Sequence, residues 1–364
     1  MSALGITALI DEPAADIMIN RVAKSGTHES QPRWPKRPIS VVVAGTGSHV
    51  PERILTNADL EKMVDTSDQW ITERTGMKER HIAAPGESAS DLAVVACEKA
   101  LAEAKVKPEE LDLIIVGTVT GDMTFPSTAC VLQQRLAAAH AAAFDVSAGC
   151  TGFIYSLSIA RQFIASGAYR TALVVGVEVL SKITDWTDRA TCVLFGDGAG
   201  AAVLKAGTEP DKGILATYLA ADGGGGRHLY MPAGGSRLPT SAETVQQRLH
   251  TLKMDGNATF KVAVRSMADA VKNLLRQTGL EPEGVKLLIP HQANLRIIDA
   301  TARLLKFPSE RVFVNIARYG NTSSATTIIA LDEARKGGLV HSGDVVMLVA
   351  FGAGLTWGGV VVRF

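Results

Sequence analysis

The sequence predicts an α/β fold built from two similar βαβ halves. Two observations support this: short apolar runs alternate with segments of helical periodicity, and the order of these segments begins again near residue 209. Such alternation indicates parallel strands covered by helices. Two halves of this kind would pack with one crevice at the carboxyl ends of their strands, so we expect a single site built from both halves.

Composition and charge exclude several classes of protein. The chain has 364 residues, of which 46% are hydrophobic and 20% charged, which is ordinary for a soluble globular enzyme. Lys and Arg number 37, as do Asp and Glu, so no global field attracts nucleic acid or an anionic membrane. We expect neither as a partner, and any acidic partner must meet a local basic patch.

Cysteine usage and the start of the chain favour a cytoplasmic protein. The four cysteines show no CxxC spacing and none lies near a histidine at zinc-ligand spacing, so neither a metal site nor a disulfide framework is expected. No apolar run approaches the roughly 18 residues that span a bilayer. Asp11, Glu12 and Asp16 stand where a signal peptide would be basic and then apolar.

The elements can be placed in order along the chain. Residues 1–38 mix charged residues, Ser and Pro around a short apolar patch, which predicts an appended, mobile extension. A first strand is expected at 40–44, with a tight loop at Gly45-Thr46-Gly47-Ser48. The alternation that follows predicts helix 91–105, strand 113–116, helix 127–139, strand 143–146, helix 150–166 and strand 172–176. We divide the rest of the chain into halves at 39–208 and 209–364.

An internal repeat supports this division. Residues 99–115 resemble residues 273–289, with Pro108 matching Pro282. Each segment reads as a helix, a turn that contains proline, and a buried strand. The similarity therefore predicts the same supersecondary unit in both halves.

A second pair of segments matches at nearly the same offset. Residues 144–167 resemble residues 314–337, and in that register Cys150 falls beside the counterpart of Asn321. Asn321 by itself reads as an N-cap that opens a helix. Its position opposite Cys150 is what makes it a candidate for the site.

Cys150 is the candidate nucleophile. It lies in Ala148-Gly149-Cys150-Thr151-Gly152, between an apolar strand and a segment of helical period, and thus at a helix N-terminus. Free amides and the helix dipole there stabilise a thiolate, which predicts a lowered thiol pKa and a nucleophile at neutral pH. On the residues alone, a small buried core cysteine stays open as the alternative.

His291 is the candidate partner of Cys150, because it follows the predicted strand 287–289 and projects into the crevice. A neutral imidazole there can donate a hydrogen bond to a developing oxyanion, although a satisfied polar group is the alternative. The glycine-rich stretches 195–200 and 351–358 lack the features of nucleotide-binding loops. An amide of the second stretch, opposite the Cys150 amide, could complete an oxyanion hole.

Several motifs occur together in a specific order: 56–70, 74–76, 125–127, 148–152, 195–200, 290–294, 320–323 and 356–358. In this order the chain, from about Ile39 to Phe364, resembles the β-ketoacyl-[acyl carrier protein] synthase III family. These are the initiating condensing enzymes of bacterial type II fatty acid synthesis. The resemblance implies the thiolase fold, in which two pseudo-symmetric βαβ halves form a five-layered αβαβα sandwich.

The resemblance also implies a catalytic triad of Cys150, His291 and Asn321. Elongating synthases use two histidines, and thiolases use a second cysteine, which does not occur here after Cys192. The implied reaction begins when Cys150 takes a short acyl group, expected to be acetyl, from acyl-CoA. Malonyl-acyl carrier protein then loses CO2, and its carbanion attacks the acyl-enzyme to give 3-oxoacyl-acyl carrier protein.

Roles for the site follow from the same resemblance. His291 and Asn321 would hydrogen-bond the malonyl thioester carbonyl, and the amides of Cys150 and Ala353 would form the oxyanion hole. CoA is implied as a substrate thioester and no cofactor is expected. The residues implied to bind CoA or line the substrate tunnel are Trp70, Arg74, Arg189, Asn257, Phe260 and Ala293. Trp70 and Arg189 would enclose the CoA adenine and Arg74 would lie near its phosphates. On the residues alone, a surface aromatic and two solvated arginines stay open as the alternative.

The acyl pocket and the macromolecular partners are implied in the same way. Phe125 and Leu355 match the acyl pocket, with Phe125 reaching it across the interface of a homodimer, where its bulk favours a short primer. The basic residues that could bind the acidic carrier protein are Lys261, Arg296, Arg303 and Lys306. For these four, an ordinary solvated surface stays open as the alternative.

Three departures from the family pattern leave the primer open: the extension of residues 1–38, Leu355 in place of a commoner aromatic, and the long glycine-rich stretch 223–252. One alternative is therefore a related ketosynthase of secondary or signalling metabolism that uses a different primer or malonyl-CoA. The non-enzymatic alternative is a sensor that binds acyl-CoA or a carrier protein. The intact triad argues against the sensor.

Overall fold

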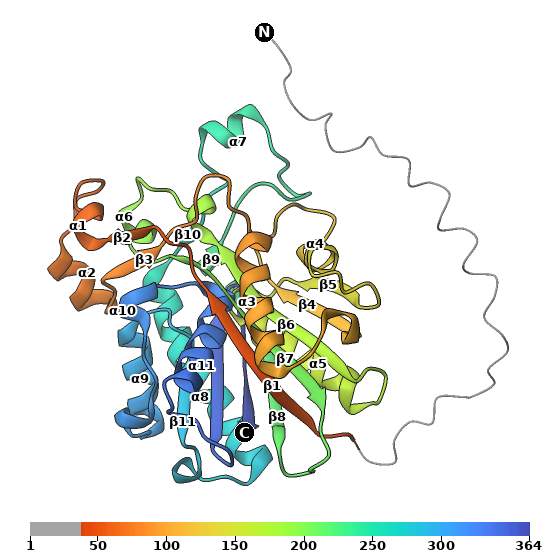
Figure 1. Cartoon of the computed structure of the whole chain (residues 1–364). Coiled ribbons are helices and arrows are strands. Elements are labelled where there is room, and N and C mark those ends of the chain that lie inside the picture. The colour runs from red at the N-terminus through yellow and green to blue at the C-terminus, as the bar shows by residue number, and fades with distance from the viewer. Residues whose placement is uncertain (1–37) are drawn as a thin grey trace, which may run out of the picture. The chain divides into compact units, whose positions relative to one another are not determined.

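The computed structural model describes residues 38–364, which form two large β-sheets surrounded and separated by helices, together with two small two-stranded sheets (Figure 1). The first sheet has the order β1-β7-β6-β4-β5, formed by Val41–His49, Asp197–Ala206, Thr171–Val179, Leu113–Gly117 and Ala142–Val146. The second has the order β11-β12-β13-β8, formed by Leu287–Pro290, Val345–Gly352, Thr356–Arg363 and Gly213–Ala221. The predicted extension of residues 1–38 lies, except for Pro38, outside the described residues. The domain boundary at residue 208 stays a prediction.

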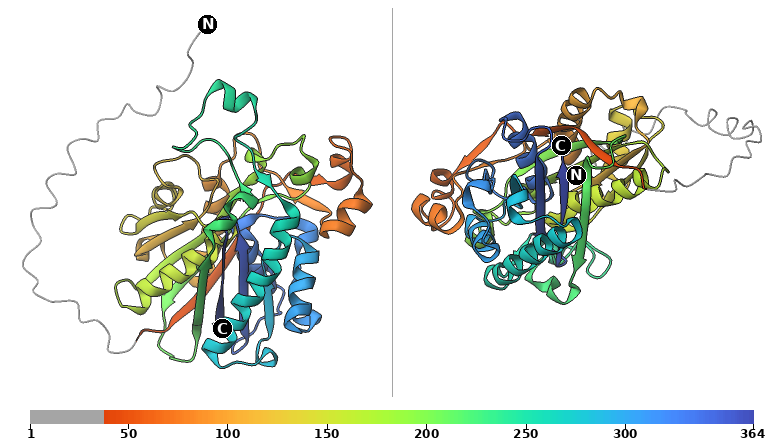
Figure 2. Two further views of the ribbon diagram at one scale, coloured as in Figure 1. Left: turned by 180° about the vertical axis from the view of Figure 1, so that it is seen from behind. Right: turned by 90° about the horizontal axis from the view of Figure 1, so that it is seen from below.

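Helices and sheets alternate in five layers (Figures 1 and 2). The outer face of the first sheet is covered by α3 (Ala89–Ala104) and α4 (Thr128–Arg135). Between the sheets lie α5 (Gly152–Ala165) and α11 (Thr326–Lys336). The outer face of the second sheet is covered by α8 (Gly256–Thr278), with α9 (Leu295–Leu305) beside it. This is the αβαβα sandwich of the thiolase fold, as the resemblance implied.

The apolar strands are buried on both faces. In β4, Leu113 and Ile115 belong to the core between the sheets, whereas Ile114 and Val116 belong to the core under α3. Because alternate side chains point to opposite faces, a strand between two helical layers must be apolar throughout. This explains why these strands could be identified as continuous apolar runs.

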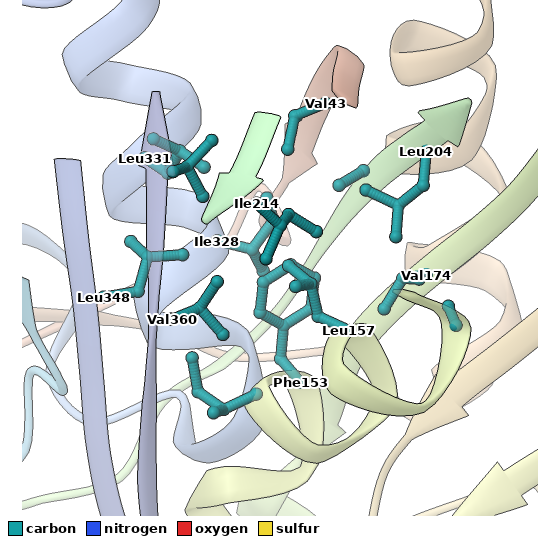
Figure 3. Close-up of a cluster of buried hydrophobic side chains, with 14 of the residues drawn as sticks. Val43, Phe153, Leu157, Val174, Leu204, Ile214, Ile328, Leu331, Leu348 and Val360 are labelled. Carbon is teal, nitrogen blue, oxygen red and sulfur yellow. The ribbon is translucent and has the colours of Figure 1, made fainter. Parts of the chain in front are cut away.

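The middle layer carries the largest core. Phe153 and Leu157 of α5 meet Ile328 of α11 between the two sheets, with Val174 from the first sheet and Leu348 from the second (Figure 3). Full burial of each such side chain contributes about 1.5–3 kcal/mol. These contacts fix the two middle helices, and therefore the residues just before each helix.

The tight loop predicted at residues 45–48 is wrong. β1 runs through these residues to His49 and pairs with β7, with a register shift between Val43 and Gly45. A Cβ on Gly45 would lie 2.5 Å from the Ala100 carbonyl oxygen, and one on Gly47 would lie 2.3 Å from that of Ala96. The glycines therefore allow α3 to approach the strand closely rather than turn the chain.

The expectation of parallel strands holds only in part. β4 pairs in parallel with β5 and β6, and β11 with β12. In contrast, β7 is antiparallel to β6 and β1, and β13 is antiparallel to β12 and β8. Only residues 353–355 join β12 to β13, and a connection this short cannot make the crossover that parallel strands require.

The internal repeat appears in the local structure. Pro108 and Pro282 each begin a 3₁₀ turn between a helix and a buried strand, in η2 (Pro108–Glu110) and η6 (Pro282–Gly284). The middle helices are also alike, because α5 is preceded by η3 (Gly149–Thr151) and α11 by η8 (Ser323–Ala325). Cys150 thus lies within the turn before one middle helix, and Asn321 lies just before the turn that precedes the other.

Candidate active site

The three predicted triad residues line one cavity of about 110 Å³. Cys150 comes from η3, His291 directly follows β11, and Asn321 lies between α10 (Ile316–Tyr319) and η8. All three are buried. Phe260 and Ala293, predicted as substrate-binding residues, line the same cavity.

Three polar donors near the Cys150 thiol act to lower its pKa, namely its own amide, the amide of Ala353 and the hydroxyl of Ser323. These donors favour the thiolate, in the direction that the sequence predicted. Burial has the larger effect, however, and raises the pKa of Cys150 to about 11. The predicted lowering of this pKa is therefore wrong, and the resting thiol is protonated at neutral pH.

Two glycines allow the loop that carries Cys150 to contact the loop that follows β12. Gly149 adopts a left-handed φ of 53°, and a Cβ there would lie 2.9 Å from the amide nitrogen of Ala353. A Cβ on Gly352, at the end of β12, would lie 2.5 Å from the amide nitrogen of Cys150. This close approach aims the amides of Cys150 and Ala353 at the same sulfur, an arrangement that suits an oxyanion hole.

His291 is neutral, and a hydrogen bond at its Nδ1 orients the imidazole ring. Burial lowers the pKa of His291 to about 3. The ring nitrogen Nδ1 lies 2.6 Å from Thr326 Oγ1, and the backbone amide of His291 donates to the Val349 carbonyl oxygen at 2.8 Å. Because Nδ1 faces Thr326, the nitrogen turned toward the cavity is Nε2.

Asn321 is oriented by its neighbours. Its Oδ1 accepts a hydrogen bond of 2.8 Å from the amide of Ser323, and its backbone nitrogen donates to the Leu194 carbonyl oxygen at 2.9 Å. Since Oδ1 is engaged, the amide nitrogen Nδ2 is available to donate to a substrate oxygen. The N-cap reading does not hold, because α11 begins only at Thr326.

A second cavity of about 320 Å³ also borders Cys150. Its wall is mostly apolar and includes Leu180, Ile183, Leu229, Met231 and Leu252. Neither predicted pocket residue is among its lining residues. Leu355 is buried instead beside Phe351 and Met267, and the Phe125 side chain is 83% exposed. The five apolar residues that do line the second cavity were not predicted from the sequence, because they come from separate segments that carry no common motif.

The residues predicted to bind the CoA adenine lie together. The guanidinium of Arg189, in α6 (Arg189–Cys192), is 4.4 Å from the ring centroid of Trp70, in α2 (Asp68–Thr75). Arg74 is exposed in the last turn of α2, and its carbonyl oxygen accepts a hydrogen bond of 3.1 Å from Asn294 Nδ2. This bond links α2 to the segment that carries His291.

The predicted basic residues are exposed on α8 and around α9. The guanidinium of Arg296 lies 5.7 Å from the ring centroid of Phe260, which places Arg296 close to the triad cavity. The others are Lys261 on α8 and Arg303 and Lys306 near the end of α9. Arg265 is exposed one turn beyond Lys261 and was missed, although its i, i+4 spacing was visible. Asn257 is exposed in the first turn of α8 and does not line the cavity.

Residues 38–364 contain neither a cluster suited to a metal ion nor a helix suited to span a membrane. In that range no group of three or more His, Cys, Asp or Glu side chains is arranged to hold a metal ion. The helices of the same range include none that combines the length and the apolar character needed to cross a bilayer.

Comparisons with known proteins agree on one family. The model described as 3-oxoacyl-[acyl-carrier-protein (ACP)] synthase III matches residues 144–223, and that of the C-terminal part of these enzymes matches residues 275–364. A β-ketoacyl-[acyl-carrier-protein] synthase III from Caldanaerobacter subterraneus subsp. tengcongensis is 58% identical over 326 residues, which cover 90% of this chain and 98% of that protein.

Solved structures show the same likeness. The crystal structure of 3-oxoacyl-[acyl-carrier-protein] synthase III from Aquifex aeolicus VF5 matches with a TM-score of 0.83 and 49% identity, covering 89% of this chain and 100% of that one. The priming β-ketosynthase from the R1128 polyketide biosynthetic pathway matches with a TM-score of 0.83 and 36% identity, covering 91% of this chain and 97% of that one.

Proposed function

The chain belongs to the β-ketoacyl-[acyl-carrier-protein] synthase III family, and on this premise we propose how its residues carry out the initiating condensation of fatty acid synthesis. It is a thiolase-fold acyltransferase that forms a carbon–carbon bond. The observation that carries the proposal is the position of Cys150. Its sulfur lies where a cavity lined by His291 and Asn321 meets an apolar cavity, with two backbone amides aimed at it.

In the first half-reaction, Cys150 attacks the carbonyl carbon of an acyl-CoA. The bond between carbon and the CoA sulfur breaks, the acyl group stays on Cys150, and CoA leaves. The amides of Cys150 and Ala353 lie beside the sulfur to which the acyl carbon bonds, and they would donate to the oxyanion that forms on that carbon in the tetrahedral intermediate. The apolar second cavity suits the hydrocarbon part of the acyl group.

In the second half-reaction, malonyl-acyl carrier protein loses CO2 and becomes an enolate. Asn321 Nδ2 donates to its thioester carbonyl, and His291 lies at the same cavity as the second polar group. The enolate carbon attacks the acyl carbonyl, and the Cys150 thiolate leaves with release of a 3-oxoacyl product. Phe260 excludes water from the decarboxylation site, since it forms an apolar part of the wall.

The thioester carriers are proposed to enter from the α2 and α9 side. Trp70 and Arg189 contact each other directly, so an adenine ring would insert between them and replace one stacking contact by two. Arg74 offers a cation for the CoA phosphates. Lys261, Arg296, Arg303 and Lys306, with Arg265, supply the positive surface for an acidic carrier protein.

The primer is proposed to be short, with acetyl-CoA as the first candidate. The second cavity has room for more than two carbons in this single chain, at about 320 Å³. Phe125 is 83% exposed, and in a homodimer it would limit the pocket of the partner subunit. The likeness to a priming β-ketosynthase of a polyketide pathway favours the alternative, in which a different acyl group is used.

Exposed apolar residues support the homodimer. Val119, Met123, Tyr230 and Met231 are between 41% and 53% exposed, and three of them, Val119, Tyr230 and Met231, line the second cavity. All four cysteines are free, which is consistent with a reducing compartment and so supports the predicted cytoplasmic location.

A primer panel tests the proposed reaction. The protein is incubated with malonyl-acyl carrier protein and one of several acyl-CoAs, and CO2 release and product mass are measured. We expect acetyl-CoA to give acetoacetyl-acyl carrier protein, and Cys150→Ala to abolish acylation. Turnover retained by Cys150→Ala would contradict the assignment of the nucleophile.

The same panel separates the two candidate functions. A strong preference for a starter other than acetyl, or for malonyl-CoA over the malonyl carrier protein, would favour the secondary-metabolism enzyme. Cys130→Ala is the matched control, because Cys130 is an exposed cysteine of α4 outside both cavities. It should leave acylation unchanged.

A further inference from the structure

Arg80, in β3 (Glu79–His81), is a fully buried arginine. Its Nε donates to the Val193 carbonyl oxygen at 3.1 Å, its Nη2 donates to the same oxygen, and its Nη1 donates to Asn57 Oδ1 at 2.5 Å. Both acceptors are neutral, and within residues 38–364 no carboxylate forms an ion pair with Arg80. Burial lowers the pKa of Arg80 to about 10, so it stays charged at neutral pH. A charge buried in this way depends on its hydrogen bonds, which therefore fix the guanidinium and its acceptors together.

Asn57 connects Arg80 to the helix that carries Trp70. A guanidinium only donates and a carboxylate only accepts, so the orientation of the Asn57 amide between them is determined. Oδ1 faces Arg80, and Nδ2 donates to Asp68 Oδ1 at 2.8 Å and to the Met77 carbonyl oxygen at 2.9 Å. Asp68 is the first residue of α2, two positions before Trp70. Arg80 thus holds the start of α2 through one buried amide.

The Val193 carbonyl connects Arg80 to the helix that carries Arg189. Val193 directly follows α6, which has four residues and begins at Arg189. The Arg189 guanidinium is the group that lies 4.4 Å from the ring centroid of Trp70. One buried guanidinium therefore holds, through different nitrogen atoms, the two segments that meet at the proposed adenine site. These segments are far apart in the sequence, and β3 lies close to both (Figure 1).

The stem of Arg80 also lies against the loop that carries Asn321. Gly320 adopts a φ of 62°, and a Cβ there would lie 3.0 Å from Arg80 Cγ. Leu194, the residue after Val193, accepts a hydrogen bond of 2.9 Å from the Asn321 amide at its carbonyl oxygen. The same arginine therefore relates the position of the proposed adenine site to the triad.

We propose that Arg80 is a positioning residue for acyl-CoA, which holds Trp70 and Arg189 at the spacing that adenine requires and in a fixed position relative to the triad. Binding at the nucleotide end of a substrate speeds a reaction at its other end only if the protein between the two ends is rigid. This inference rests on the proposed function and adds a residue to its first half-reaction.

The test compares two thioesters that differ only at the nucleotide end. Acetyl-pantetheine carries the same reacting group and arm as acetyl-CoA but no adenine nucleotide. Arg80→Met removes every donor of the guanidinium and keeps a long side chain. We expect it to lower the rate constant for Cys150 acylation by acetyl-CoA, measured at low substrate concentration, about tenfold, as for lost hydrogen bonds to a charged group. Acylation by acetyl-pantetheine should change by less than about twofold. Equal losses for both thioesters would indicate a general structural role and overturn the proposal.

A double-mutant cycle tests whether Arg80 acts through the adenine site. In a Trp70→Ala background the contact that Arg80 positions is already lost. Arg80→Met should then lower acylation by acetyl-CoA by no more than about a further twofold. A full tenfold loss in that background would contradict the proposed route.

Asn57→Ser provides a second variant in which the charge of Arg80 is kept. The serine side chain is too short to contact both Arg80 and Asp68, so the connection to α2 is broken. The same selective loss for acetyl-CoA is expected, and this variant decides the question if Arg80→Met does not fold. Arg161→Met is the matched control, because Arg161 of α5 also donates from Nε to a backbone carbonyl oxygen, that of Ile214 at 3.2 Å. It should keep the wild-type ratio of the two acylation rate constants.

The outcomes separate this inference from the proposed function. If neither thioester acylates wild type, the proposed function fails and the inference fails with it. If wild type shows no preference for acetyl-CoA over acetyl-pantetheine, the proposed adenine site fails. If wild type prefers acetyl-CoA and both Arg80→Met and Asn57→Ser keep the wild-type ratio, this inference alone is wrong.

Discussion

Ser323 organises the triad through its backbone and its side chain. Its amide donates to Asn321, its carbonyl accepts from Thr326, which contacts His291, and its hydroxyl donates to Glu178 and lies near enough to the Cys150 thiol to lower its pKa. It does so from a left-handed conformation with a φ of 48°, which a residue other than glycine rarely adopts. Such strain is tolerated where the surroundings hold it, and here four contacts do so.

Glu178 is one of these four contacts, through a buried carboxyl group. This carboxyl group, near the end of β6, accepts hydrogen bonds from the Ser323 hydroxyl at 3.2 Å and from the amide of Val119. Thr118 and Thr120 also donate to it. Burial is the largest cause that raises the pKa of Glu178 to about 7. The folded protein therefore keeps this group protonated over a pH range in which the unfolded chain has lost the proton.

We expect a pH-dependent difference between wild type and Glu178→Gln. A raised folded pKa contributes stability below the unfolded value of 4.5, and this is lost as the pH rises to about 7. Glutamine stays neutral, so the free energy of unfolding of the variant relative to wild type should increase by roughly 2–3 kcal/mol between about pH 5 and pH 8. Urea denaturation at both pH values measures it.

Titration of His291 does not affect the difference in unfolding free energy between wild type and Glu178→Gln. Burial lowers the pKa of His291, so its contribution to stability is present above about pH 6.5 and is lost on acidification, in both proteins alike. Parallel pH profiles for wild type and Glu178→Gln would mean that Glu178 does not carry the titration.

At the scale of elements, the contact between β1 and α3 shows how glycine sets the distance between layers. A Cβ at Gly47 would lie 2.3 Å from the Ala96 carbonyl oxygen and 2.6 Å from the Ala100 amide nitrogen. Backbone atoms cannot swing away as a flexible side chain can. The helix would have to move off the strand, and the apolar core under α3 would be opened.

Gly47→Ala should lower the free energy of unfolding by about 1–3 kcal/mol, the usual cost of overpacking. Gly86→Ala is the control, since a Cβ at Gly86 would meet nothing within 4 Å. It should change stability by less than about 0.5 kcal/mol. Thermal and denaturant unfolding of the two variants measure the difference, and equal stability would show that α3 can shift without cost.

At the scale of the whole molecule, the edge of the first sheet and the second cavity share an exposed apolar region. β5 ends the sheet order and has unpaired strand edges, and the neighbouring segment carries Met123 and Phe125. Edge strands and large exposed apolar side chains are features that proteins usually cover. A second copy of the chain, as expected from the family, would cover both.

Phe125→Asp should weaken the dimer and widen the primer range. The charge would be buried at the expected interface, and the acyl pocket of the partner subunit would lose the side chain that limits it. Light scattering after size-exclusion chromatography should give a smaller mass, and octanoyl-CoA should become a better primer. Leu339→Asp is the control, because Leu339 is 47% exposed and borders a different cavity; it should remain dimeric.

The sequence predicted what short motifs and periodicity determine. The buried strands could be read because they depend on a local pattern, and local patterns also made Cys150 and His291 candidates. Asn321 became a candidate only through the internal repeat, and the triad was implied by the family resemblance. The loop expected at Gly45 was wrong because the reason for that glycine is a helix about 50 residues away. Glu178 and Ser323 are separated by 145 residues, so no local signal links them.

The two cavities at Cys150 also constrain the order of events. In the proposed reaction the acyl group stays in the apolar cavity while CoA is exchanged for the malonyl carrier in the cavity lined by His291 and Asn321, so these two carriers bind in turn. Free CoA then competes with the second substrate although it is a product of the first. A high ratio of free CoA to acyl-CoA in the cell would thereby slow the initiating condensation.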